Sequence, residues 1–210
     1  MKKLSVKLAA AIGAAVLGAA SLGVAAANAG SQHPRAVFSM QRSPGIVAAG
    51  CVPNAQARVV IKQAGPVELM TVEASGLPAN TDFDLFVIQV PNAPFGVSWY
   101  QGDLETNAHG RGHQTYVGRF SVETFAIALN TAPAPVVHTS PPFPDAASNP
   151  PFAPVHTYHL GLWFNLPAHA ARAGCPGATT PFNGEHNAGV QVLNTAQFPL
   201  DHGPLRQVGS

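Results

Sequence analysis

The sequence is poor in charged residues and contains no motif that names a reaction. Asp, Glu, Lys and Arg make up 10% of the 210 residues, whereas an average chain contains about 25%. This composition excludes a coiled coil, a long-helix bundle, a charge-driven disordered tail and a basic nucleic-acid binder. The motifs G-x-S-x-G, H-E-x-x-H, G-x-G-x-x-G and the P-loop are absent. We therefore predict no catalytic residue and favour a non-enzymatic role.

The N-terminus has the features of a secretory signal. Three lysines among the first seven residues are followed by an apolar stretch over residues 8–27, interrupted by Ser21. The small residues Ala27 and Ala29 mark a cleavage site, so residues 1–29 are predicted to be a signal peptide. A retained membrane anchor is less favoured, because the stretch is rich in Ala and interrupted by Gly. We expect a secreted, extracellular protein with no membrane span in the mature chain.

Cleavage changes the charge balance of the chain. It removes three of the four lysines and leaves eight basic against ten acidic residues, a net charge of −2 with histidine neutral. This balance argues against nucleic acid and anionic membranes as partners. Lys62 remains as the single lysine, which argues against lysine-based covalent catalysis. All nine histidines remain, and protonating them all would raise the net charge to +7.

Cys51 and Cys175 are the two cysteines of the chain. In an exported protein such a pair predicts one structural disulfide, and closing so long a loop is worth roughly 4–5 kcal/mol in chain entropy. Residues 47–51 faintly resemble a lipoprotein cleavage site, but they lie too far beyond the apolar stretch. A redox or metal-binding pair would be expected to show C-x-x-C spacing, which is absent.

Short apolar runs separated by Gly and Pro predict an all-β domain. The predicted strands cover residues 57–63, 67–74, 83–90, 96–100, 113–120, 122–128, 156–164 and 189–194. One short helix is expected after Asn165, which would cap it, and before Gly174. Closely spaced strands without alternating helices indicate an antiparallel β-sandwich. We expect an N-terminal arm over residues 30–50 and a single domain over 51–210 with a long Pro-rich loop at 131–155.

One segment carries a resemblance to a known fold family. Residues 75–85 read Ser-Gly-Leu-Pro-Ala-Asn-Thr-Asp-Phe-Asp-Leu. They resemble the Leu-x-Pro-x-Thr-x-Tyr corner of fibronectin type III and related immunoglobulin-like domains, although Pro78 stands one position early and Phe83 replaces the tyrosine. The resemblance implies an immunoglobulin-like sandwich in which this corner joins strands of the two sheets. Beyond the corner, the chain resembles uncharacterised exported bacterial proteins, which implies no activity.

The segment 102–113 contains the candidate metal ligands. Asp103, Glu105, His109 and His113 offer oxygen and imidazole donors at short spacing. The calcium-loop pattern fails, because Glu105 is at its third position and Ala108 replaces its glycine. A polar hairpin tip at 107–112 explains the same residues. We therefore expect no resident cofactor and keep a metal site as an alternative.

Aromatic residues and a nearby arginine suggest a different site. Trp99, Tyr100 and Arg111 are candidates for contact with a sugar or peptide, since aromatic rings offer a large contact area, although large aromatics in a sandwich more often pack in the core. The favoured function is extracellular binding of a protein or carbohydrate at the cell surface. The alternatives are a metal-binding protein or metal-dependent enzyme that uses the 103–113 loop, and a structural envelope protein.

Overall fold

The computed structural model describes residues 36–120, 157–175, 177, 180, 187–200 and 202–209. The predicted signal peptide, the strand predicted at 122–128 and the Pro-rich loop at 131–155 lie outside these residues. Eight strands dominate the described part, and the predicted all-β class is confirmed. Their bounds are β1 (Ala36–Arg42), β2 (Gln56–Ala64), β3 (Val67–Ser75), β4 (Asp82–Ile88), β5 (Ser98–Glu105), β6 (Gly112–Gly118), β7 (His159–Phe164) and β8 (Gln191–Asn194).

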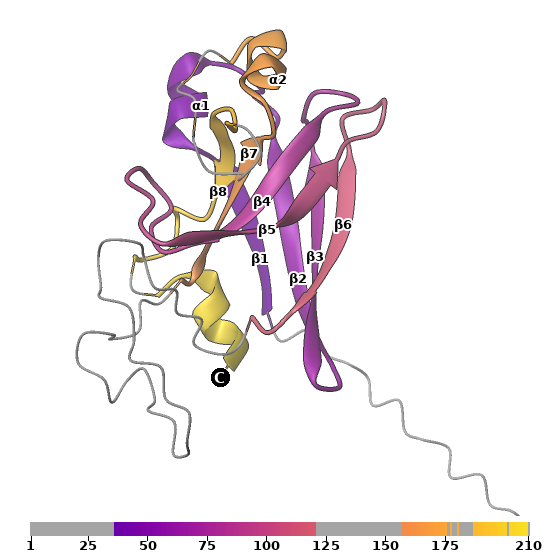
Figure 1. The fold of residues 1–210 in the computed structure, drawn as a ribbon, viewed down its shortest axis with the longest axis vertical. Helices are drawn as coiled ribbons and strands as arrows, with labels where there is room; N and C mark the ends of the chain where they lie inside the picture. The colour runs from indigo at the N-terminus through magenta and orange to yellow at the C-terminus, as the bar shows by residue number, and fades with distance from the viewer. Residues whose placement is uncertain are drawn as a thin grey trace, which may run out of the picture. The chain divides into compact units, whose positions relative to one another are not determined.

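The strands pair antiparallel in one continuous sheet, in the order β5-β4-β7-β8-β1-β2-β3-β6 (Figure 1). Strand β1 belongs to both parts of this sheet, because its first five residues pair with β2 and its last two pair with β8. The two outermost strands, β5 and β6, are consecutive in the chain and meet at a bridge between Thr106 and Gly112. The hydroxyl of Tyr116 also donates to the carbonyl of Asp103 (3.0 Å). The sheet is therefore nearly closed, like a barrel.

The strands fall into two groups by burial. Strands β1, β2 and β3 alternate buried with more exposed residues, and β6 exposes most of one face; together they form the one-sided half. Strands β4, β7 and β8 are buried on both faces and form the two-sided half. The main core lies inside the sheet and includes Phe83, Leu85, Leu160 and Leu162. A second apolar cluster covers the other face of the two-sided half with Phe86, Ile88, Trp163 and Ala188.

The segment expected to be a loose N-terminal arm contains ordered structure instead. Residues Ala36, Phe38 and Met40 are buried and alternate with exposed ones, which is the pattern of a half-buried strand. Helix α1 (Pro44–Ala49) follows at once. The hydroxyl of Ser43 caps this helix by accepting from the backbone of Ile46. The expectation of a loose arm was therefore wrong for residues 36–49. The strand and the helix were overlooked in the sequence because they contain only 7 and 6 residues.

The predicted disulfide is confirmed. Cys51 follows α1 and Cys175 follows α2 (Pro167–Arg172), and the bond joins positions 124 residues apart with 5.4 Å between their Cα atoms. Figure 1 shows the two helices at the same end of the sheet. Helix α2 is the predicted helix, but its N-cap is Leu166 without a side-chain hydrogen bond, so the expected cap at Asn165 was wrong. No helix in the described part is long and apolar enough to cross a membrane.

The corner at residues 75–85 connects β3 of the one-sided half to β4 of the two-sided half. Gly76 has a φ of 69°, and a Cβ there would collide with the carbonyl of Asn54, so only glycine fits. The hydroxyl of Thr106 donates to the carbonyl of Pro78 (2.6 Å) and accepts from the backbone of Thr81 (2.9 Å). These bonds fix the corner against the turn between β5 and β6.

Candidate functional site

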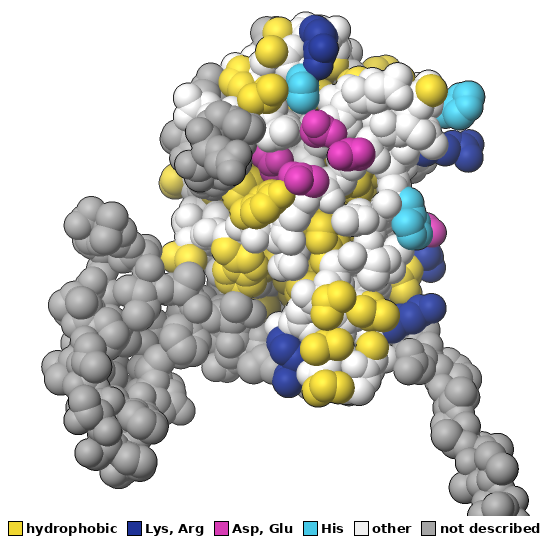
Figure 2. All heavy atoms as spheres, turned by 45° about the vertical axis from the view of Figure 1, so that its right-hand side comes forward, with side chains coloured by type: hydrophobic (Ala, Val, Ile, Leu, Met, Phe, Trp, Pro, Cys, Tyr) yellow, Lys and Arg dark blue, Asp and Glu magenta, His cyan; other side chains and the backbone are white. Residues whose placement is uncertain are grey.

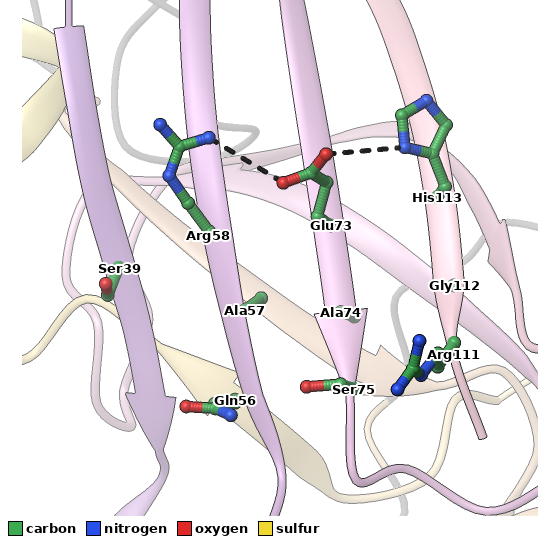
Figure 3. A pocket seen from close by; sticks show the side chains of 10 residues that line it. All are labelled: Ser39, Gln56, Ala57, Arg58, Glu73, Ala74, Ser75, Arg111, Gly112 and His113. Carbon is green, nitrogen blue, oxygen red and sulfur yellow. Dashed lines mark ion pairs between the residues drawn. The ribbon is translucent and has the colours of Figure 1, made fainter. Parts of the chain in front are cut away.

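A hollow of about 610 Å³ lies on the exposed face of the one-sided half (Figure 3). We call it the polar groove, because its lining is dominated by charged and hydrogen-bonding side chains. Strands β1, β2, β3 and β6 supply most of them, and the turn before β6 supplies Arg111, so the groove is built mainly on paired strands. The polar lining residues are Ser39, Gln56, Arg58, Glu73, Ser75, Arg111 and His113.

Strand register places four of these residues in one row across the sheet. Ser39 is opposite Arg58, Arg58 is opposite Glu73, and Glu73 is opposite His113. The Arg58 Nη1 lies 3.6 Å from the Glu73 Oε2, and the His113 Nδ1 lies 3.9 Å from the Glu73 Oε1. All three side chains are more than half exposed, so the Arg58–Glu73 ion pair and the His113–Glu73 contact add little to stability. Their spacing is nevertheless fixed by the strands that carry them.

Arg111 stands just before β6, at the end of the turn that follows β5. The Asn107 Oδ1 accepts from the backbone N–H groups of His109 (2.9 Å) and Arg111 (3.2 Å), which holds the turn in shape. This is the polar hairpin tip that the sequence predicts at 107–112. Within the described residues the Arg111 guanidinium makes no ion pair or hydrogen bond, and Figure 3 shows it beside the groove on the side of Ser75.

The groove carries more positive than negative charge. Arg58 and Arg111 contribute two guanidinium groups, and Glu73 is the single carboxylate in the lining. With His113 neutral, the lining has a net charge of +1. A guanidinium presents five donors in a planar arrangement that matches a carboxylate, and Glu73 does not use them all. The groove is therefore suited to a negatively charged group.

The four candidate metal ligands are not brought together. Asp103 and Glu105 lie on β5, not in a loop, and face Asp84 and Asp82 across the strand pair. His109 lies in the turn, and His113 lies in the polar groove beside Glu73. Throughout the described ranges, no group of three or more His, Cys, Asp and Glu residues is placed to hold a metal ion. Spacing in the sequence does not show this separation, because Asp103 and Glu105 lie on β5, whereas His113 lies on β6 in the row with Glu73.

Acidic residues lie opposite one another on β4 and β5: Asp103 and Glu105 are exposed, Asp82 is half-buried and Asp84 is buried. The exposed members form a separate negative surface, and Figure 2 shows most acidic side chains of that view gathered in one group. Asp103 accepts a hydrogen bond from the Tyr100 hydroxyl (2.6 Å). Burial raises the pKa of Tyr116 well above its ordinary value, and the charge of Asp103 raises it further, with smaller effects of Tyr100 and Asp84. Like charges directly opposite each other are unfavourable, and this surface repels anions, in contrast to the polar groove.

The aromatic candidates lie apart from Arg111. Trp99 is partly buried against the main core, whereas Tyr100 points the other way and packs edge-on against Phe86, with 5.7 Å between ring centroids. Tyr100 is the one aromatic side chain in the described part that is largely exposed. An aromatic row for stacking a sugar is therefore not formed by these residues, and of the three ligand candidates Arg111 alone lines the polar groove.

Sequence reasoning missed Arg58 and Glu73. The alternation within 57–63 and 67–74 was a usable signal, because it places both residues on the exposed face of their strands. It does not supply the register that sets them beside His113.

Comparison with known protein families, curated proteins and solved structures finds no match to this chain.

Proposed function

We propose that this protein is an extracellular binding protein that holds its ligand in the polar groove, at the cell surface. The observation that carries the proposal is the Arg111 guanidinium, which has no partner in the described part of the chain and stands in the same hollow as Arg58. Two guanidinium groups around one carboxylate are an unusual concentration of charge for a chain with 10% charged residues. The predicted signal peptide supports the extracellular setting.

The scaffold of the groove supports the same proposal. Arg58 and Glu73 project from neighbouring paired strands, so their backbone positions change little when a ligand arrives. Side chains on such a scaffold lose less conformational entropy on binding than side chains on a mobile loop. The two alternative functions, a metal-dependent protein and a structural envelope protein, have no observation of this kind in their favour among the described residues.

We also propose that the nearly closed sheet is an immunoglobulin-like sandwich. Two features support this assignment: β1 divides its pairing between the two parts of the sheet, and the corner at 75–85 joins strands that do not pair with each other. In an aligned sandwich the mean strand directions of the two layers differ by about 30°. An experimental structure with the two layers near 90° would contradict the assignment.

The binding function is tested with arrays of glycans and peptides. We would compare the secreted protein with Arg111→Ala and with Arg172→Ala, a matched control in which an exposed arginine of α2 is removed outside the groove. The expected result is a set of array positions bound by the wild type and the control, and lost in Arg111→Ala. Equal binding by all three proteins, or binding by none, would contradict the proposal.

A further inference from the structure

The polar groove also indicates the chemistry of its ligand. Resting on the proposed function, we infer that the ligand is anchored by a singly charged carboxylate on a hydroxylated molecule, namely a uronic acid unit of an acidic polysaccharide. Three features of the groove carry this inference: its charge, the way it already holds one carboxylate, and the neutral polar side chains beside the charged row.

The charge of the groove matches a monoanion. Arg58, Arg111 and Glu73 sum to +1 when His113 is neutral, so one carboxylate neutralises the site. A phosphate monoester carries about −1.5 to −2 at neutral pH. It would leave excess negative charge close to Glu73, and like charges a few ångströms apart repel. The site therefore favours a carboxylate over a phosphate group.

The row across the sheet already accommodates a carboxylate. The Glu73 carboxylate lies between two basic side chains, 3.6 Å from the Arg58 guanidinium and 3.9 Å from the His113 imidazole. Figure 3 shows Arg111 beyond this row, toward Ser75, with its guanidinium on the groove side. A ligand carboxylate on Arg111 can accept two parallel N–H bonds, the arrangement that gives guanidinium its preference for carboxylates.

Neutral hydrogen-bonding groups distinguish a sugar acid from an acidic peptide. Ser39, Gln56 and Ser75 line the groove beside the charged row, and Gln56 is opposite Ser75 across β2 and β3. Their side chains form no hydrogen bond within the described residues. Hydroxyl and amide groups both donate and accept, so they suit the hydroxyls of a sugar ring. An acidic peptide offers them one N–H and one C=O per residue, whereas each sugar ring offers several hydroxyls that both donate and accept.

Calorimetric titration with defined probes tests the inference. The probes are trigalacturonate, its fully methyl-esterified form, triglutamate and inorganic phosphate, each added to the secreted protein at low salt. The ester has the hydroxyls of the acid without its charge, and triglutamate has the charge without the hydroxyls. We expect trigalacturonate to bind, triglutamate to bind at least several-fold more weakly, and the ester and phosphate not to bind detectably.

Variants assign the binding to the groove. Arg111→Ala should weaken trigalacturonate by about tenfold, the loss of one charge-assisted hydrogen-bonded pair, while Arg172→Ala leaves it unchanged. Glu73→Gln removes the repelling carboxylate, so trigalacturonate should bind several-fold more tightly and phosphate should begin to bind. A change in phosphate binding would not follow from a merely structural role of Glu73.

Several results would overturn the inference: equal binding of the ester and the acid, equal binding of triglutamate, stronger binding of phosphate, no binding of trigalacturonate, or binding that Arg111→Ala leaves unchanged. The arrays separate this failure from that of the proposed function. An Arg111-dependent ligand without a carboxylate would retain the binding function and reject the uronic acid. The absence of any Arg111-dependent ligand would reject both.

Discussion

The two halves of the sheet differ in what their side chains can do. In the two-sided half, β4 and β7 lie between the main core and the second apolar cluster, and β8 is buried throughout, so almost every side chain is packed. In the one-sided half, every second side chain of β2 and β3 is free to meet solvent. Stability therefore depends mainly on the first half, whereas a binding surface can be built on the second without disturbing the core.

The contrast is visible in single residues of β7. Trp163 is fully buried and packs edge-on against Phe86 and Phe95. Gly161 makes room for it, because a Cβ at that position would collide with the indole ring. This packing leaves no room for a larger side chain at position 161. The charged side chains of the groove, those of Arg58, Glu73 and His113, are instead more than half exposed.

The largest expected effect compares the same substitution in the two halves. Leu162 of β7 is fully buried, whereas Leu69 of β3 is half-buried on the outer face. Leu162→Ala should lower the free energy of unfolding by about 2–5 kcal/mol, because it removes packed methyl groups and leaves a cavity. Leu69→Ala should lower it by about 1 kcal/mol or less.

Urea denaturation of the two leucine variants measures the difference. The midpoint should fall much further for Leu162→Ala than for Leu69→Ala, with similar slopes. Equal losses would show that the outer face of β3 is covered in the folded protein, and the distinction between the two halves would be lost.

A smaller effect concerns a histidine buried at the start of β7. The Nε2 of His159 donates to the carbonyl of Leu200 (3.2 Å), so the proton lies on Nε2, and the Nδ1 accepts from the hydroxyl of Thr195 (3.0 Å). Burial lowers the pKa of His159 below its ordinary value, although backbone hydrogen bonds at Leu200, Thr195 and Pro199 oppose the shift. The neutral side chain thus connects β7 to the segment that follows β8.

The direction of the pH effect follows from the lowered pKa. Between the unfolded value of about 6.5 and the lower folded value, the unfolded chain binds more protons than the native protein. The contribution of neutral His159 to the free energy of unfolding is therefore fully present above about pH 6.5. It falls as the pH drops below that value, by at most about 1.4 kcal/mol per pH unit for one group. His159→Gln, which does not titrate, should show a shallower decline of the denaturation midpoint between pH 7 and 5. Parallel curves for the two proteins would reject this role.

The sequence predicts the two-sided half better than the site. Continuous apolar runs such as residues 85–88 identify buried central strands from the sequence alone. The disulfide follows from two cysteines and a predicted export signal, and the hairpin tip follows from Asn107 and the glycines around it. Each of these predictions depends on local sequence.

The polar groove depends on strand register and was therefore not predictable in full. His113 and Arg111 were singled out by residue type, but their neighbours Arg58 and Glu73 are brought in by strands distant in the sequence. The candidate metal ligands illustrate the same limit: Asp103 and Glu105 lie on β5, His109 lies in the turn and His113 lies on β6, and spacing alone does not reveal their relative positions. The expectation of a loose arm was wrong for residues 36–49, where β1 pairs with β2 and β8, and these partners lie far from it in the sequence.

The smallest expected effect is on the stability of the groove itself. Arg58→Ala removes an ion pair with Glu73 in which both side chains are more than half exposed, so the free energy of unfolding should change by about 0.5 kcal/mol or less. Any difference measured at 50 mM NaCl should shrink at 500 mM, because salt screens exposed charges. A loss comparable to that of Leu162→Ala would mean that the row from Ser39 to His113 supports the fold. If the row from Ser39 to His113 is not needed for folding, its charged side chains can change partners when a ligand binds.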